Sequence, residues 1–173
     1  RRVAENLVRC SPLAVAAALL LASCGGDAGA DTSTTAVGSP VFVGADGVTS
    51  EIVDTSRLVS LSGDLTEAVV ELGMGESVGA TDVTTIYPPE AVALPVVGVG
   101  RFLTAEGVLR EEPTLVLGDT QTSPPEAIEQ IRSAGVPVVI FDVPTTFEAL
   151  YDKAADIGEV LGVPDAGREL AET

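Results

Sequence analysis

From residue 57 onward, the chain alternates between short apolar runs and stretches of helical spacing. Four runs lack the polar alternation of a half-exposed strand, which is typical of strands covered on both faces of a sheet: 58–61, 78–80, 114–117 and 136–141. The stretches between and after them carry apolar residues three or four positions apart, as amphipathic helices do. Strands separated by helices belong to right-handed crossover units. The pattern therefore predicts an α/β fold with a mostly parallel sheet and helices on both faces.

Helix boundaries are marked by particular residues. Asp64 and Glu67 have the spacing of a capping box at the start of the first helix. Glycines 73, 135 and 162 follow the last apolar position of three helices, where a left-handed residue commonly ends the helix. The longest helix starts at Phe147, and its spacing predicts that Leu150, Ala154, Ile157 and Leu161 face inward.

Ligands of parallel α/β sheets bind beyond the carboxyl ends of the strands. This rule places the loops 62–63, 82–89 and 119–123 on one rim of the predicted sheet. Asp82 and Asp119 lie in these loops and could supply the acid and base of an enzyme. An aspartate at such a position is more often a turn former, and no specific spacing accompanies the pair. We therefore expect no enzymatic activity.

The first 24 residues have the features of an export signal. Three arginines precede an apolar run at 13–22, which is about half the length that crosses a bilayer. The sequence Leu-Ala-Ser-Cys that ends at Cys24 resembles the bacterial lipobox, whose cysteine receives diacylglycerol and becomes the new N-terminus. We expect a lipoprotein signal peptide over 1–23. The alternative, a signal-anchor helix closed by a buried cysteine, is disfavoured because no second apolar stretch extends the span.

The segment after Cys24 is poor in large apolar residues. Residues 25–40 are mostly Gly, Ala, Asp, Ser and Thr, a composition that cannot offset the entropy of ordering. We assign 24–55 to a flexible tether and 56–173 to the folded domain. An acyl chain on Cys24 would hold that domain at the outer, extracytoplasmic face of the cell membrane.

Composition excludes several classes of function. Acidic residues number 26 against 9 Lys and Arg, a formal net charge of −17, which is the opposite of a nucleic-acid-binding surface. The chain has no histidine, so it cannot by itself build a Ser-His-Asp site or a zinc site with imidazole ligands. Its two cysteines, at positions 10 and 24, leave the folded domain without a disulfide.

Two residues are candidates for binding. Tyr87 precedes Pro88 and Pro89, which stiffen the loop, so a phenol on the rim would be presented at low entropic cost. The alternative is a ring that packs against the domain. Arg101 follows a glycine pair on a strongly acidic chain. It is either a solvated arginine near a turn or a guanidinium kept to meet an anion.

Five motifs follow one another along the chain: residues 57–67, Tyr87-Pro88-Pro89, 94–98, 101–107 and 113–117. Their order resembles that in the N-terminal lobe of the haem-binding substrate-binding proteins of ABC importers. The wider group, which also carries cobalamin and ferric siderophores, has two α/β lobes joined by one long helix. The resemblance covers the chain from residue 57 onward and about half of a typical member, which implies that 56–173 is the N-terminal lobe and that the C-terminal lobe is missing.

The resemblance implies roles for three residues. Tyr87 matches the tyrosine that ligates ferric haem iron through its phenolate, a ligand that proteins do use for haem. Arg101 matches the arginine of the family's Arg-x-Leu-Ser/Thr-Ala-Glu motif, and we expect it to face the pocket and meet a haem propionate or the phenolate. Glu126 matches an exposed glutamate that pairs with arginines of the membrane permease. Its alternative role is that of an acid favoured by the helix dipole.

The resemblance thus predicts a lipid-anchored receptor that binds haem as its transported ligand and uses no catalytic cofactor. Tyr-Pro-Pro alone is not specific, because cobalamin binders of the group can show it too. A cobalamin or ferric-siderophore receptor is therefore the alternative, and the combination of Tyr87 with residues 101–107 favours haem.

Overall fold

The computed structural model describes residues 40–98 and 102–172, which contain six strands, six α-helices and one short 3₁₀ helix. The strands are β1 Val41–Val43, β2 Thr49–Glu51, β3 Leu58–Ser60, β4 Val78–Ala80, β5 Leu115–Asp119 and β6 Val138–Phe141. The helices are α1 Gly63–Glu71, η1 Gly75–Ser77, α2 Pro89–Val92, α3 Ala105–Leu109, α4 Pro125–Ser133, α5 Phe147–Val160 and α6 Pro164–Ala171. Within these residues, no helix combines the length and the apolar run that a membrane span requires. The predicted signal peptide and Cys24 lie outside the described residues.

The central sheet is parallel, as predicted. Its order is β4-β3-β5-β6, and each neighbouring pair is parallel. A further parallel bridge between Thr81 and Val96 extends it beyond β4. The four strands fall on the four apolar runs of the sequence, with shifts of one or two residues at their ends. The α/β prediction is therefore confirmed.

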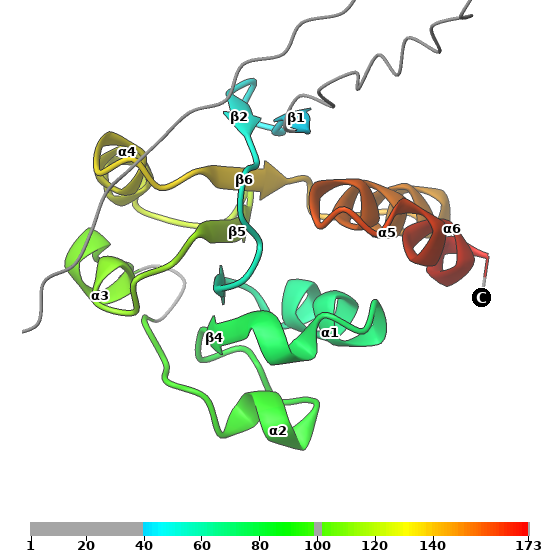
Figure 1. Ribbon diagram of the computed structural model, residues 1–173, viewed down its shortest axis with the longest axis horizontal. Coiled ribbons are helices and arrows are strands. Elements are labelled where there is room, and N and C mark those ends of the chain that lie inside the picture. The colour runs from blue at the N-terminus through cyan, green and yellow to red at the C-terminus, as the bar shows by residue number, and fades with distance from the viewer. Residues whose placement is uncertain (1–39, 99–101, 173) are drawn as a thin grey trace, which may run out of the picture. The chain divides into compact units, whose positions relative to one another are not determined.

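Helices cover both faces of the sheet, which explains why its strands are apolar without alternation. One core cluster joins Leu58, Leu115 and Val139 to α1 and α5. The opposite cluster joins the residues next to them in each strand to α3 and α4. Figure 1 shows α1, α5 and α6 on one side of the strands and α3 and α4 on the other. Both faces of each central strand are thus removed from water.

The predicted helix ends are confirmed at all three glycines. Gly73, Gly135 and Gly162 have φ values of 77°, 89° and 76°, in the left-handed region that only glycine enters without steric cost. Each follows a helix and turns the chain out of it.

Two details of the helix predictions are wrong. The first helix begins at Gly63 with Ser62 as its N-cap, so Asp64 and Glu67 form no capping box. Asp64 instead accepts hydrogen bonds from the Ser62 hydroxyl and from Lys153 on α5. Leu150 is exposed although its spacing predicted burial, because the buried face of α5 begins only at Lys153 and continues through Ile157.

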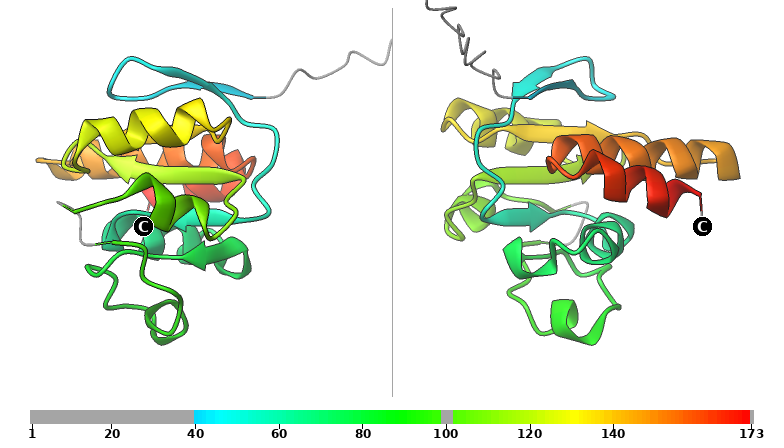
Figure 2. Two further views of the ribbon diagram at one scale, coloured as in Figure 1. Left: turned by 90° about the vertical axis from the view of Figure 1, so that its left-hand side faces the viewer. Right: turned by 45° about the vertical axis from the view of Figure 1, so that its right-hand side comes forward.

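A β-hairpin occupies part of the predicted tether. β1 and β2 pair antiparallel between residues 41 and 51, so the prediction of a flexible tether over 24–55 is wrong for this stretch. The hairpin is held by long-range contacts: the Ala45 amide donates to the carbonyl of Ile140 at 2.7 Å, and Arg132 of α4 pairs with Asp46 at 2.8 Å. Figure 2 shows it lying along the edge of the domain beside β6. Packing of Phe42 and Ile52 on the core offsets the entropy of ordering this stretch.

Candidate ligand-binding site

Three loops meet in a cavity of about 820 Å³ at the carboxyl ends of the strands. Ser62 follows β3, residues 82–84 follow β4, and Asp119 ends β5 and is followed by residues 121–123. These loops are the ones that the rule for parallel α/β sheets predicted to share a rim. Leu61 and Phe102 complete the lining.

The border of the cavity carries exposed apolar side chains. Phe102 is 78% exposed although it lines the cavity, and Val83, which also lines it, is exposed as well. Ile86 and Tyr87, further along the loop after β4, are also exposed. Large apolar side chains in contact with water indicate a surface that a ligand or partner covers.

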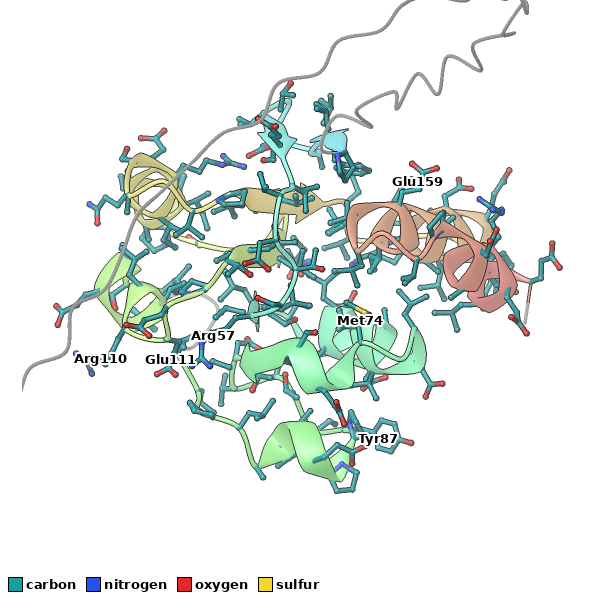
Figure 3. The ribbon with its side chains drawn as sticks, viewed as in Figure 1. Arg57, Met74, Tyr87, Arg110, Glu111 and Glu159 are labelled. Carbon is teal, nitrogen blue, oxygen red and sulfur yellow. The ribbon has the colours of Figure 1, made fainter. Side chains whose placement is uncertain are left out.

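Tyr87 lies on the loop between β4 and α2. Its side chain is 53% exposed, and Figure 3 shows it extending away from the ribbon close to α2. It is not among the residues that line the cavity, and its peptide bond to Pro88 is cis. The phenol is thus accessible from solvent, three residues beyond the cavity wall at Thr84.

Asp82 is a buried acid that shapes the loop. It is 3% exposed, and its Oδ1 accepts hydrogen bonds from the Thr84 amide at 3.0 Å and from the Thr84 hydroxyl at 2.6 Å. Burial raises the pKa of Asp82, the charges of Asp119 and Asp64 raise it further, and the two bonds from Thr84 oppose the rise. This geometry is that of an aspartate which closes a turn on its own backbone, the role that its position predicted.

Asp119 organises the opposite wall in the same way. Its carboxylate accepts from the amide of Gln121 at 2.8 Å, and its own amide donates to the Thr122 hydroxyl at 3.0 Å. Asp82 and Asp119 are the charged residues among those that line the cavity, so the described wall presents negative charge only.

Of the other predicted site residues, only Glu126 lies within the described residues, and it is not among those that line the cavity. Glu126 is exposed in the first turn of α4, as both of its proposed roles require. Arg101 and Cys24 lie outside the described residues. Sequence reasoning placed Thr84 on the rim with its loop but gave it no role, and it missed Phe102 as part of the cavity. For Phe102 a signal existed, since it sits inside the motif 101–107.

The family described as Periplasmic binding protein matches residues 58–173. The match covers more than half of the chain, and the chain belongs to this family. The parallel four-strand sheet with its flanking helices agrees with the fold of this family.

Solved structures of high similarity are haem-binding proteins. The periplasmic heme-binding protein RhuT from Roseiflexus sp. RS-1, in its apo form, is 45% identical with a TM-score of 0.66 over 69% of this chain and 46% of that one. The heme-binding protein HmuT is 32% identical with a TM-score of 0.73 over 82% of this chain and 46% of its own. The predicted resemblance to this group is therefore confirmed.

Curated relatives include receptors for another ligand. The vitamin B12-binding protein of Pectobacterium carotovorum subsp. carotovorum (strain PC1) is 33% identical over 51% of this chain and 32% of its own length. The uncharacterized ABC transporter substrate-binding lipoprotein YvrC of Bacillus subtilis (strain 168) is 28% identical over 91% of this chain and 52% of its own. The chain thus spans between about a third and about half of the length of these relatives.

Proposed function

We propose that this chain is part of an extracytoplasmic receptor that binds haem and delivers it to an ABC importer. The observation that carries the proposal is the cavity at the carboxyl ends of the strands, bordered by exposed aromatic and aliphatic side chains. The similar solved structures of haem-binding proteins support it, the first of them at 45% identity. In this proposal the chain binds its ligand without turnover.

Haem matches the chemistry of this surface. A porphyrin offers a broad apolar face, and covering Phe102, Val83 and Ile86 with it removes apolar area from water. A tyrosine phenolate is an established type of axial ligand for haem iron. Tyr87 is exposed on the same loop as Val83 and Ile86, so we assign it to the iron.

The propionates of haem need a cation, and we assign that role to Arg101. Asp82 and Asp119 give the described cavity wall a negative charge, which disfavours a carboxylate there. The net charge of −17 also gives an anionic ligand no attraction at long range. Capture must therefore depend on short-range contacts, of which a guanidinium–carboxylate pair is among the strongest.

Tyr87→Phe is expected to abolish the ferric-tyrosinate absorption bands of the intact protein mixed with hemin, and to weaken hemin binding by about tenfold or more, the equivalent of one lost ligand bond. Tyr151→Phe is the matched control, because Tyr151 is similarly exposed but lies on α5. Absorption titration measures both effects. If Tyr87→Phe keeps the wild-type spectrum, the phenol is not the ligand.

Arg101→Ala is expected to lower hemin affinity by about tenfold through the loss of a charge-assisted pair. Arg110→Ala serves as its control, since Arg110 is exposed and is engaged by Glu106 at 3.0 Å on the surface of α3. Fluorescence quenching on titration with hemin measures both affinities. Equal losses of hemin affinity in the two variants would mean that Arg101 acts only as a surface charge.

Cobalamin is the second candidate, because curated relatives are vitamin B12-binding proteins. The two ligands are separated by parallel titrations of the intact protein with hemin and with cyanocobalamin. Submicromolar binding of cyanocobalamin together with no hemin spectrum would favour this candidate.

The remaining parts of the proposal concern anchoring and delivery. We propose that Cys24 carries the lipid that holds the receptor at the outer face of the membrane, as the resemblance of its segment to a lipobox suggests. We propose further that Glu126 pairs with a permease arginine. Its exposure in the first turn of α4 leaves the carboxylate available to a partner.

A further inference from the structure

We propose that Thr84 and Thr85 are positioning residues for Tyr87. Their hydroxyls hydrogen-bond the loop 82–87 to the first turn of α1 and so determine the position of the phenol. The inference rests on the proposed function, in which Tyr87 ligates the iron of the transported haem.

The first fastening is a chain of hydrogen bonds from Asp82 through Thr84 to Gly63. The Thr84 hydroxyl donates to the buried Asp82 carboxylate at 2.6 Å and accepts from the Gly63 amide at 2.9 Å. Because an ionised carboxylate only accepts and a hydroxyl has one proton, the direction of both bonds is determined. The Gly63 amide is one of the N–H groups that the start of α1 leaves without a helical partner, and the Ser62 side chain does not cap it.

The second fastening joins two buried threonines. Thr85 and Thr66 are 6% and 0% exposed, and their hydroxyl oxygens lie 3.2 Å apart. The Thr66 hydroxyl donates to the carbonyl of Ser62 at 3.0 Å, so its proton is already used. Thr85 must then be the donor to Thr66. The two threonines of the loop thus bond to two different residues of α1, Thr84 to Gly63 and Thr85 to Thr66.

Close backbone contact accompanies these bonds. A Cβ added at Gly63 would lie 2.6 Å from the carbonyl oxygen of Thr84 and 3.0 Å from its carbonyl carbon. Glycine at position 63 therefore allows the loop to approach the helix, and the two threonines bond across that contact. Sequence reasoning placed residues 62–63 on the rim but gave Gly63 no role.

Tyr87 depends on its backbone for its position. Within the described residues no hydrogen bond holds its hydroxyl, and its ring is half-exposed. It follows Thr85 by two positions in a loop without regular secondary structure. A side chain that ligates a metal must be held within a fraction of an ångström of the productive geometry, and the residues that pack or hydrogen-bond around it provide this support. Here that support comes from the two threonine hydroxyls.

The test compares valine, serine and control variants of the intact protein. Thr84→Val and Thr85→Val remove one hydroxyl each at nearly constant shape, and Thr84→Ser restores the hydroxyl. The matched control is Thr114→Val, because the Thr114 hydroxyl also makes two bonds, to the Arg57 amide at 3.0 Å and the Arg57 carbonyl at 3.1 Å, just before β5 and away from the rim. Gly63→Ala disturbs the same contact from the side of the helix.

Two measurements are made on each variant. In the ligand-free protein, amide hydrogen exchange over 83–87 is expected to be about tenfold faster in both valine variants, since each loses one bond that holds the loop. With hemin, the same variants are expected to show shifted ferric-tyrosinate bands and about tenfold faster hemin loss to apomyoglobin. Thr84→Ser and Thr114→Val are expected to match the wild type over this segment and in the spectrum. Gly63→Ala is expected to follow the valine variants.

The outcomes separate this inference from the proposed function. If the wild type shows tyrosinate bands while both valine variants exchange and bind as Thr114→Val does, the positioning role is overturned and the haem receptor stands. If the wild type binds no hemin, the proposed function fails whatever the exchange shows. If it binds hemin without tyrosinate bands, Tyr87 is not the ligand and the positioning role is overturned. If one valine variant does not fold, the comparison of Gly63→Ala with Thr84→Ser decides in its place.

Discussion

Gly158→Ala is expected to destabilise the domain by about 2–3 kcal/mol, although alanine is the better helix former by about 1 kcal/mol. Gly158 lies inside α5, where that helix crosses Gly167 of α6. A Cβ at Gly158 would lie 2.6 Å from the Gly167 Cα, 3.0 Å from its nitrogen and 3.1 Å from the Val163 oxygen. All three are backbone atoms, so the clash is relieved only if the two helices separate. Separation would loosen the packing of Ile157 in the core.

Urea unfolding measures this loss, and an unchanged slope of free energy against urea would show that only stability has changed. Gly75→Ala is the matched control, because the nearest atoms to a Cβ there are methyl carbons of the half-buried Val70 side chain, the closest at 3.2 Å, and not backbone. Its effect is expected to stay within about 0.5 kcal/mol. A Gly158→Ala variant as stable as the wild type would mean that α5 and α6 do not need this contact.

The sequence predicted the features that depend on neighbouring residues. The strands of the sheet were recognisable because helices cover both of its faces, so β3 and β6 are apolar at every position or nearly so. The helix ends at Gly73 and Gly162 were recognisable because a left-handed residue favours glycine whatever surrounds it. The cavity position followed from the predicted parallel sheet, because ligands bind beyond the carboxyl ends of its strands.

The features that the sequence did not predict depend on residues far apart in the chain. The hairpin β1–β2 is short, and its contact with β6 joins Ala45 to Ile140, so composition alone indicated a tether. The capping-box spacing at Asp64 was misleading for the same reason. The Asp64 carboxylate accepts a hydrogen bond from Lys153, which lies 89 positions away, and no local pattern reveals this contact.

The residues of the candidate site also differ in whether neighbouring residues or distant ones reveal their role. Tyr87 stood out because of the prolines after it and because of the resemblance, both of which are local signals. The hydroxyl of Thr84 did not stand out, since its role requires the loop after β4 to meet the start of α1. Threonine is common in loops, and nothing in its neighbours distinguishes one that bonds across to a helix.

Asp64→Asn is expected to lower the free energy of unfolding by about 3 kcal/mol, because it leaves the buried ammonium of Lys153 without a counter-charge. Lys153 is 6% exposed, and its Nζ donates to Asp64 Oδ2 at 2.6 Å. Lys153→Met is expected to cost only about 1 kcal/mol, since it removes the buried charge and leaves an aspartate whose side chain is 48% exposed. The double variant should recover most of the loss of Asp64→Asn. Urea unfolding at neutral pH measures all three.

Acid unfolding gives the same pair an independent test. Burial raises the pKa of Asp64, but the hydrogen bonds from Lys153 and Ser62 and the lysine charge outweigh it, so the pKa is lowered from its ordinary value. Ionised Asp64 therefore stabilises the fold above an ordinary aspartate pKa of about 3.9, and this contribution is lost as the pH falls through the lowered value. Asp64→Asn should lose that part of the pH dependence. We expect Asp64→Asn to lose more stability than Lys153→Met, because only Asp64→Asn leaves a buried charge unpaired. Equal losses in the two variants, together with unchanged acid profiles, would contradict this expectation.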